Sequence, residues 1–166
     1  MGASKPSRRS IDPWITLLLL AFALILILLV YTRVFFPNYL LGPFRVFHWL
    51  GWIGALYIAL SIPAYHFLKR RHPKRFLTLL RLHTFGNLAS AALVSAHVTQ
   101  QLTRSTLPDL ATGLTLILIL ALLVSTGIAL RFFGSTPKAR GVRFLHMGVT
   151  AAFYLDLLVH MLHGLG

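Results

Sequence analysis

Five long apolar stretches with almost no charged residues make up most of this 166-residue chain. They cover residues 14–33, 46–68, 82–103, 110–131 and 144–164. A helix needs about 20 apolar residues to cross a hydrocarbon core of roughly 30 Å, so each stretch is long enough to span a bilayer. The sequence therefore predicts an all-α integral membrane protein with five transmembrane helices, forming a single domain over residues 1–166.

Charge is scarce and unevenly placed. Charged residues are 11% of the chain, against about 25% in soluble proteins, and the net charge is +13. Of the 16 Lys and Arg residues, 13 precede the first stretch or lie in the connections at 69–81 and 131–143. Because cytoplasmic loops carry the excess of basic residues, we predict a cytoplasmic N-terminus and an external C-terminus. We expect the basic loops to contact anionic lipid and not nucleic acid.

Histidines recur inside two of the stretches at the same interval. His83 and His97 are fourteen residues apart, and so are His146 and His160. At about 100° and 1.5 Å per residue, fourteen steps return a side chain to within roughly 40° of its direction and advance it about 21 Å. The third and fifth predicted helices therefore each carry two imidazoles on one stripe, one toward each end.

The third and fifth helices run parallel, because one helix separates them. His83 then shares the cytoplasmic level with His146, and His97 shares the external level with His160. Two facing imidazole pairs at two levels fit the axial ligation of two haems, since neutral imidazole is a strong ligand for haem iron. A lone intramembrane histidine is often only hydrogen-bonded across helices, but the repetition on two helices favours haem.

Small residues are expected to make room for a porphyrin beside these ligands. Gly86, Ala89 and Ser90 follow His83, and Gly148, Ala151 and Ala152 follow His146. The fourth predicted helix has no histidine and no interior charge, so we interpret it as a packing helix.

Two histidines about fourteen apart on each of two parallel helices resemble the two-haem core of the cytochrome b superfamily. This superfamily includes the b subunits of quinol–cytochrome c oxidoreductases and the ferric reductase-like transmembrane domains. The resemblance covers residues 45–165 and includes the stretch HTFGN, where a glycine follows the first ligand. It implies two haems b, which are the metal-containing cofactors, held in a four-helix bundle of the second to fifth helices.

Basic side chains near the ligands are candidates for the haem propionates. Arg81 and Arg143 are the candidates on the cytoplasmic side, and Arg104 is the candidate on the external side. Arginine forms strong charge-assisted hydrogen bonds to carboxylates. Each of these residues is also explained by topology and by contact with lipid headgroups.

Three further polar residues are candidates for supporting the ligands or for a proton path: Asp156, Asn87 and His163. Asp156 lies one turn before His160, where it could accept a hydrogen bond from the imidazole. Asn87 lies one turn beyond His83, and we expect His163 at the outer interface. His48 and His66 are at opposite ends of the second helix and compete only weakly as ligands.

The sequence therefore predicts a b-type membrane cytochrome that carries electrons across the membrane, with a redox protein or a quinone as partner. It does not decide whether the chain is an electron-transfer protein or an oxidoreductase subunit. One alternative is a small quinone- or oxygen-reactive membrane oxidoreductase. Another, of a different class, is a transporter whose histidines bind a metal or relay protons.

Overall fold

The computed structural model describes residues 11–35, 39–103 and 111–165. Its helices are α1 (Asp12–Tyr31), α2 (Val46–Arg71), α3 (Phe76–Leu102), α4 (Ala111–Phe133) and α5 (Ala139–Leu165), with a 3-10 turn at Pro73–Arg75. Two short strands, β1 (Leu40–Leu41) and β2 (Phe44–Arg45), pair as an antiparallel hairpin. Arg104 lies outside the described residues.

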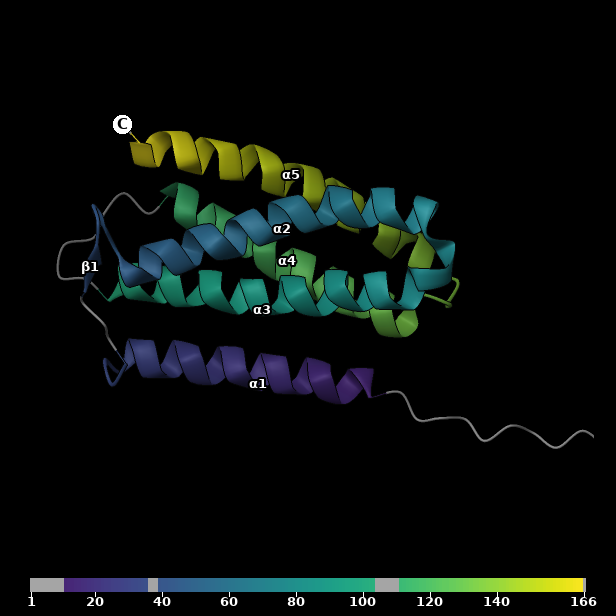
Figure 1. Cartoon of the computed structure of the whole chain (residues 1–166), viewed down its shortest axis with the longest axis horizontal. Helices are drawn as coiled ribbons and strands as arrows, with labels where there is room; N and C mark the ends of the chain where they lie inside the picture. The colour runs from purple at the N-terminus through teal and green to yellow at the C-terminus, as the bar shows by residue number, and fades with distance from the viewer. Residues whose placement is uncertain (1–10, 36–38, 104–110, 166) are drawn as a thin grey trace, which may run out of the picture.

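The five helices run alternately up and down in an elongated bundle (Figure 1). α3 is central, since it packs against α1, α2 and α4. α5 packs against α4, on the far side of the bundle from α1 (Figure 1). The start of α1 and the α2–α3 and α4–α5 turns share one end of the bundle, which we call the basic end. The hairpin and the C-terminus of α5 lie at the opposite end (Figure 1).

The helices extend beyond the apolar stretches, and local residues determine where they begin and end. α2 continues through Lys69, Arg70 and Arg71, where basic side chains favourably face the helix C-terminus. It ends before Pro73, which cannot continue the hydrogen-bond ladder. Helices α3 and α5 begin at residues 76 and 139, earlier than the predicted 82 and 144. The apolar stretches are bounded at charged residues, because charge marks the edge of a lipid-facing surface. Charged residues are nevertheless compatible with a helix, so each helix extends beyond its apolar stretch.

Glycine is required at the hairpin. Gly42 joins β1 to β2 with a φ of +64°, a left-handed conformation that glycine adopts without steric cost. The hairpin lies against the start of α2, where Trp49 Nε1 donates a hydrogen bond of 2.8 Å to the carbonyl of Leu41.

Four of the described helices, α1, α2, α4 and α5, are long and apolar enough to cross a membrane. Their outer faces carry large apolar side chains: Leu18, Leu118 and Leu155 are 66–69% exposed. Apolar surface on this scale is typical of a multi-pass membrane protein, where lipid covers it. α3 is less apolar, and its buried residues include Ser90, Thr99 and Gln100.

A core of buried apolar side chains holds α2 to α5 together. It consists of Ile58, Ala91, Val94, Leu116, Leu120, Leu123, Val149, Phe153 and Leu157. Small residues bring α2 against α3, as expected for close helix contact. A Cβ at Gly54 would lie 2.7 Å from the carbonyl oxygen of Ser90, and one at Gly51 would lie 2.8 Å from the His97 ring.

Candidate functional site

A cavity of about 520 Å³ lies among α2, α3, α4 and α5 in the basic half of the bundle. His83 of α3 and His146 of α5 both line it, so the structure brings this predicted pair to one space. His66 of α2 also lines the cavity. The volume is within the range of small-molecule and cofactor sites.

The cavity has an apolar body and several basic side chains. Its apolar lining comes from α2, α3, α4 and α5, which we call the inner bundle, and includes Ile58, Leu88, Leu120 and Leu123. Lys69, Arg131 and Arg143 contribute the positive charge. Such a lining suits a ligand with an apolar body and acidic groups at one end.

His83 is held by contacts on two sides. The Tyr65 ring stacks on the imidazole with a centroid distance of 4.6 Å and an interplanar angle of 15°. Nδ1 lies 3.1 Å from the side-chain amide nitrogen of Asn87, whose Oδ1 accepts a 2.5 Å hydrogen bond from Ser61. Asn87 therefore contacts the predicted ligand directly, as expected from its position one turn along α3.

The Ser61–Asn87 pair is compatible with either neutral form of His83. In the arrangement above, the Asn87 amide donates to Nδ1 and leaves the imidazole proton on Nε2. Rotating the amide by half a turn exchanges its donor and acceptor. Ser61 then donates to the carbonyl of Ile58, at 3.2 Å, and Nδ1–H of His83 donates to Oδ1. This second arrangement leaves Nε2 with its lone pair.

His146 is held from α4. Its Nδ1 lies 2.8 Å from the hydroxyl oxygen of Thr126, which is buried, and its Cε1 would be 3.6 Å from a Cβ at Gly127. The predicted packing helix therefore contributes a polar contact to the site.

The predicted arginines have different environments. Arg143 lines the cavity and donates to the carbonyl of Gly134 at 3.2 Å. Arg81 is not among the lining residues; its Nε donates to Asp12 at 3.0 Å. Asp12 is 2% exposed and also forms an ion pair with Arg131, which the sequence did not single out. This network ties the start of α1 to the cavity wall.

The second predicted pair, His97 and His160, is not part of the cavity lining. The ring of His97 contacts that of His48 edge-on, with centroids 5.2 Å apart, and lies against Gly51. His48 also accepts a 3.0 Å hydrogen bond from Trp52 Nε1. On α5, Nδ1 of His160 lies 3.0 Å from the hydroxyl oxygen of Thr112.

Asp156 and His163 complete the predicted set. The hydroxyl oxygen of Thr112 lies at Nδ1 of His160, and the Oδ2 atom of Asp156 is buried with no hydrogen-bond partner among the described residues. His163 is exposed near the end of α5, at the hairpin end of the bundle.

Two of the small residues expected to make room for a porphyrin, Gly86 and Gly148, have other surroundings. A Cβ at Gly86 would overlap the hydroxyl of Tyr57, so this glycine accommodates a tyrosine of α2. Gly148 is exposed and has no neighbour within 4 Å of a Cβ. The glycines that face the α5 histidines are Gly113 and Gly127 of α4.

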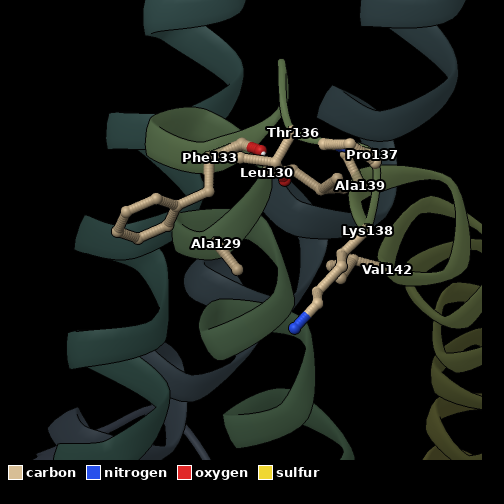
Figure 2. A pocket seen from close by; sticks show the side chains of 8 residues that line it. All are labelled: Ala129, Leu130, Phe133, Thr136, Pro137, Lys138, Ala139 and Val142. Atoms are coloured by element: carbon tan, nitrogen blue, oxygen red, sulfur yellow. Dashed lines mark hydrogen bonds between the residues drawn. The ribbon is translucent and has the colours of Figure 1, made fainter.

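A second hollow, of about 480 Å³, lies at the α4–α5 turn. Figure 2 shows its eight lining side chains, which come from the end of α4, the turn and the start of α5. Lys138 is the charged residue among them, and no histidine lines the hollow. It therefore has fewer side chains that could bind a metal or an acidic ligand than the cavity between His83 and His146.

Sequence reasoning missed the two threonines of α4, although a signal was present. Thr–Gly pairs occur at 112–113 and 126–127, with the same fourteen-residue interval as the histidines of α5. Since α4 and α5 pack side by side, matching intervals place a Thr–Gly pair beside each histidine.

Comparisons with protein-family models, with curated proteins and with solved structures find no match to the chain. The resemblance to two-haem cytochromes b therefore depends on the histidine pattern. Within the described residues, no three His, Cys, Asp or Glu side chains are placed to hold a metal ion. A bis-histidine haem site needs only two protein ligands.

Proposed function

We propose that this protein is a b-type membrane cytochrome that binds haem between His83 and His146 and transfers electrons across the membrane. The observation that carries the proposal is that these two histidines, 63 positions apart in sequence, line one cavity with an apolar body and basic side chains. Haem b has this same division, a large apolar macrocycle with two carboxylates. When bound, it supplies one-electron redox chemistry through its iron.

The residues around the cavity have separate roles in this proposal. His83 and His146 supply the axial nitrogens, with Asn87 and Thr126 orienting their rings. Lys69, Arg131 and Arg143 neutralise the carboxylates, and the apolar side chains of the inner bundle exclude water.

We extend the proposal to a second haem between His97 and His160, about 21 Å farther along the bundle. Its support is the repeated fourteen-residue interval on α5 and the repeated threonine contact, to His160 as to His146. Two haems at two levels connect a donor on one side of the membrane with an acceptor on the other, and the donor or acceptor is a redox protein or a quinone.

The proposal includes five transmembrane helices with α3 in the middle. α3 has less contact with lipid than the others because α1, α2 and α4 surround it, and this explains how it tolerates buried polar residues such as Gln100. The basic end of the bundle faces the cytoplasm in this proposal, as the distribution of Lys and Arg favours.

Haem stoichiometry tests the proposal. Protein purified from membranes in mild detergent should contain two haems per chain by the pyridine haemochrome assay, with b-type bands on reduction. His83→Ala and His146→Ala should each remove the same haem. His72→Ala is the matched control, because His72 is exposed and does not line the cavity.

Folded wild-type protein without haem would refute the proposal. If the protein contains one haem per chain and both His83→Ala and His146→Ala lose it, the site between these two histidines is supported. The proposed second site between His97 and His160 is then refuted. Loss of different haems from these two variants would refute the pairing.

The rival functions make different predictions for the same preparation. A histidine-based metal transporter would bind a transition metal without haem, and the described residues offer no three-ligand site for one. A proton-relaying transporter would also contain no haem. A quinone- or oxygen-reactive oxidoreductase would contain haem and would be recognised by oxidation of its reduced haem with a quinone or with oxygen.

A further inference from the structure

The histidine-free helix α4 repeats one contact at two levels of the bundle. Thr126 Oγ1 lies 2.8 Å from Nδ1 of His146, and Thr112 Oγ1 lies 3.0 Å from Nδ1 of His160. The glycine after each threonine faces the same imidazole, with Cε1 at 3.6 Å and 3.5 Å from a Cβ built on Gly127 and Gly113. Nδ1 of His146 and Nδ1 of His160 therefore each contact the hydroxyl of a threonine of α4.

The direction of the hydrogen bond at Thr126 follows from counting protons. A threonine hydroxyl has one proton and two lone pairs. The hydroxyl of Thr126 donates to the carbonyl of Leu122 at 2.7 Å, one turn earlier in α4. With the hydroxyl proton in the contact to Leu122, the shortest that this oxygen makes, the oxygen accepts from His146 and the imidazole proton is on Nδ1. A neutral imidazole has only one N–H, and Nε2 is left with a free lone pair.

We propose that Thr126 is a positioning residue that keeps the His146 proton on Nδ1 and thereby prepares Nε2 to bind a metal. We extend this role to Thr112 at His160, because the fourteen-residue spacing and the contacts with the imidazole repeat those of Thr126 and Gly127. A donated Nδ1–H bond also makes the ligand more basic. The inference deepens the proposed function, which supplies the identity of the metal as haem iron.

His146 and His83 differ in this respect. The contacts of His83 with Asn87 and Ser61 are compatible with a proton on either nitrogen. The contacts of His146 with Thr126 favour a proton on Nδ1. His146 is therefore the ligand whose contacts favour one chemical form before haem binds.

The first test needs no haem. In haem-free wild-type protein labelled with ¹⁵N-histidine, the nitrogen chemical shifts of His146 should identify the Nδ1–H form, and Thr126→Val should lose this preference. Thr115→Val is the matched control, because Thr115 is exposed on the same helix and its hydroxyl donates to the carbonyl of Ala111 at 2.9 Å. A wild-type His146 with its proton on Nε2 would overturn the inference.

The second test uses the haem-loaded protein. Thr126→Val should weaken haem binding at the His83–His146 site roughly 10- to 100-fold, as loss of a ligand-orienting contact does, and should raise the midpoint potential of that haem. Thr126→Ser, which keeps the hydroxyl, should restore both, and Thr115→Val should change neither. Equal affinity and potential in Thr126→Val and wild type would overturn the inference.

The two tests separate failure of the inference from failure of the proposed function. Wild-type protein that binds no haem removes the proposed function, while the nitrogen shifts of His146 still decide the position of the proton. If Thr126→Val does not fold, the wild-type spectrum decides the inference, since a proton on Nε2 of His146 would overturn it.

Discussion

At the scale of single residues, the two arginines predicted to contact haem show what helical geometry determines. Arg143 precedes His146 by three positions, which turns its side chain about 60° from the histidine, and it lines the same cavity. Arg81 precedes His83 by two positions, about 160° away, and it contacts Asp12 instead. Proximity in sequence was the basis for predicting both, and the rotation around the helix separates them.

Arg143 provides a test of the acidic end of the ligand. Arg143→Gln should weaken haem binding at this site about tenfold or more, because a hydrogen bond between charged groups contributes roughly 1.5–3 kcal/mol. Arg140→Gln is the matched control, since Arg140 is exposed and does not line the cavity. The measurement is a haem titration of the haem-free variants. Equal affinities in both variants would show that Arg143 does not contact the carboxylates.

The polar partners of the histidines were harder to predict than the histidines themselves. Asn87 was identified because it is on the same helix as His83, one turn away. Thr126 and Thr112 are on a different helix from the histidines they contact, so only the packing of α4 against α5 reveals them. Likewise, Asp156 was considered because it shares α5 with His160, whereas Thr112, which contacts Nδ1 of His160, belongs to the neighbouring helix.

At the scale of helices, the apolar stretches predicted all five helices, and hydropathy alone did not reveal their arrangement. α1 is surrounded by little protein and is nearly all apolar, whereas the central α3 is less apolar and has buried polar side chains. Gly51 and Gly54 are points of close approach between α2 and α3. α4 packs in the bundle as predicted, and it also contacts two histidines, which the sequence did not predict.

The contact between α2 and α3 at Gly54 can be tested by adding one methyl group. Gly54→Ala should destabilise the fold by about 1–3 kcal/mol, since the new Cβ would lie 2.7 Å from the backbone carbonyl of Ser90 and the backbone cannot easily move. Gly148→Ala is the matched control: nothing lies within 4 Å of its Cβ, so alanine should stabilise α5 by up to about 1 kcal/mol. The measurement is loss of helical circular dichroism on titration with a denaturing detergent. Equal stability of the two variants would show that the helices do not meet closely at Gly54.

At the scale of the whole molecule, α1 is fixed to the rest of the bundle at both ends. Asp12 pairs with Arg81 of α3 and Arg131 of α4, and Arg33 donates a 2.7 Å hydrogen bond to the carbonyl of Thr103. Charged groups are costly to bury without a partner, so the Asp12 network favours one register of α1 along α3. The sequence did not predict this network, because its three members are about 50 to 120 positions apart and no local pattern connects them.

The orientation of the bundle in the membrane can be tested by cysteine labelling, because the sequence contains no cysteine of its own. Single cysteines at Lys74 and Ser135, both exposed in turns at the basic end, should react with a membrane-impermeant maleimide only in inverted vesicles. A cysteine at Leu41, exposed in the hairpin at the opposite end, should react only in intact cells. Basic loops remain in the cytoplasm, and this asymmetry is the physical reason for the expected result. Residues 74 and 135 are separated by α3 and α4, so they share a side only if both helices cross or neither does. α4 is one of the four strongly apolar helices. Labelling of Lys74→Cys and Ser135→Cys from opposite sides would therefore show that α3 does not span the membrane, and labelling of both from outside would reverse the orientation.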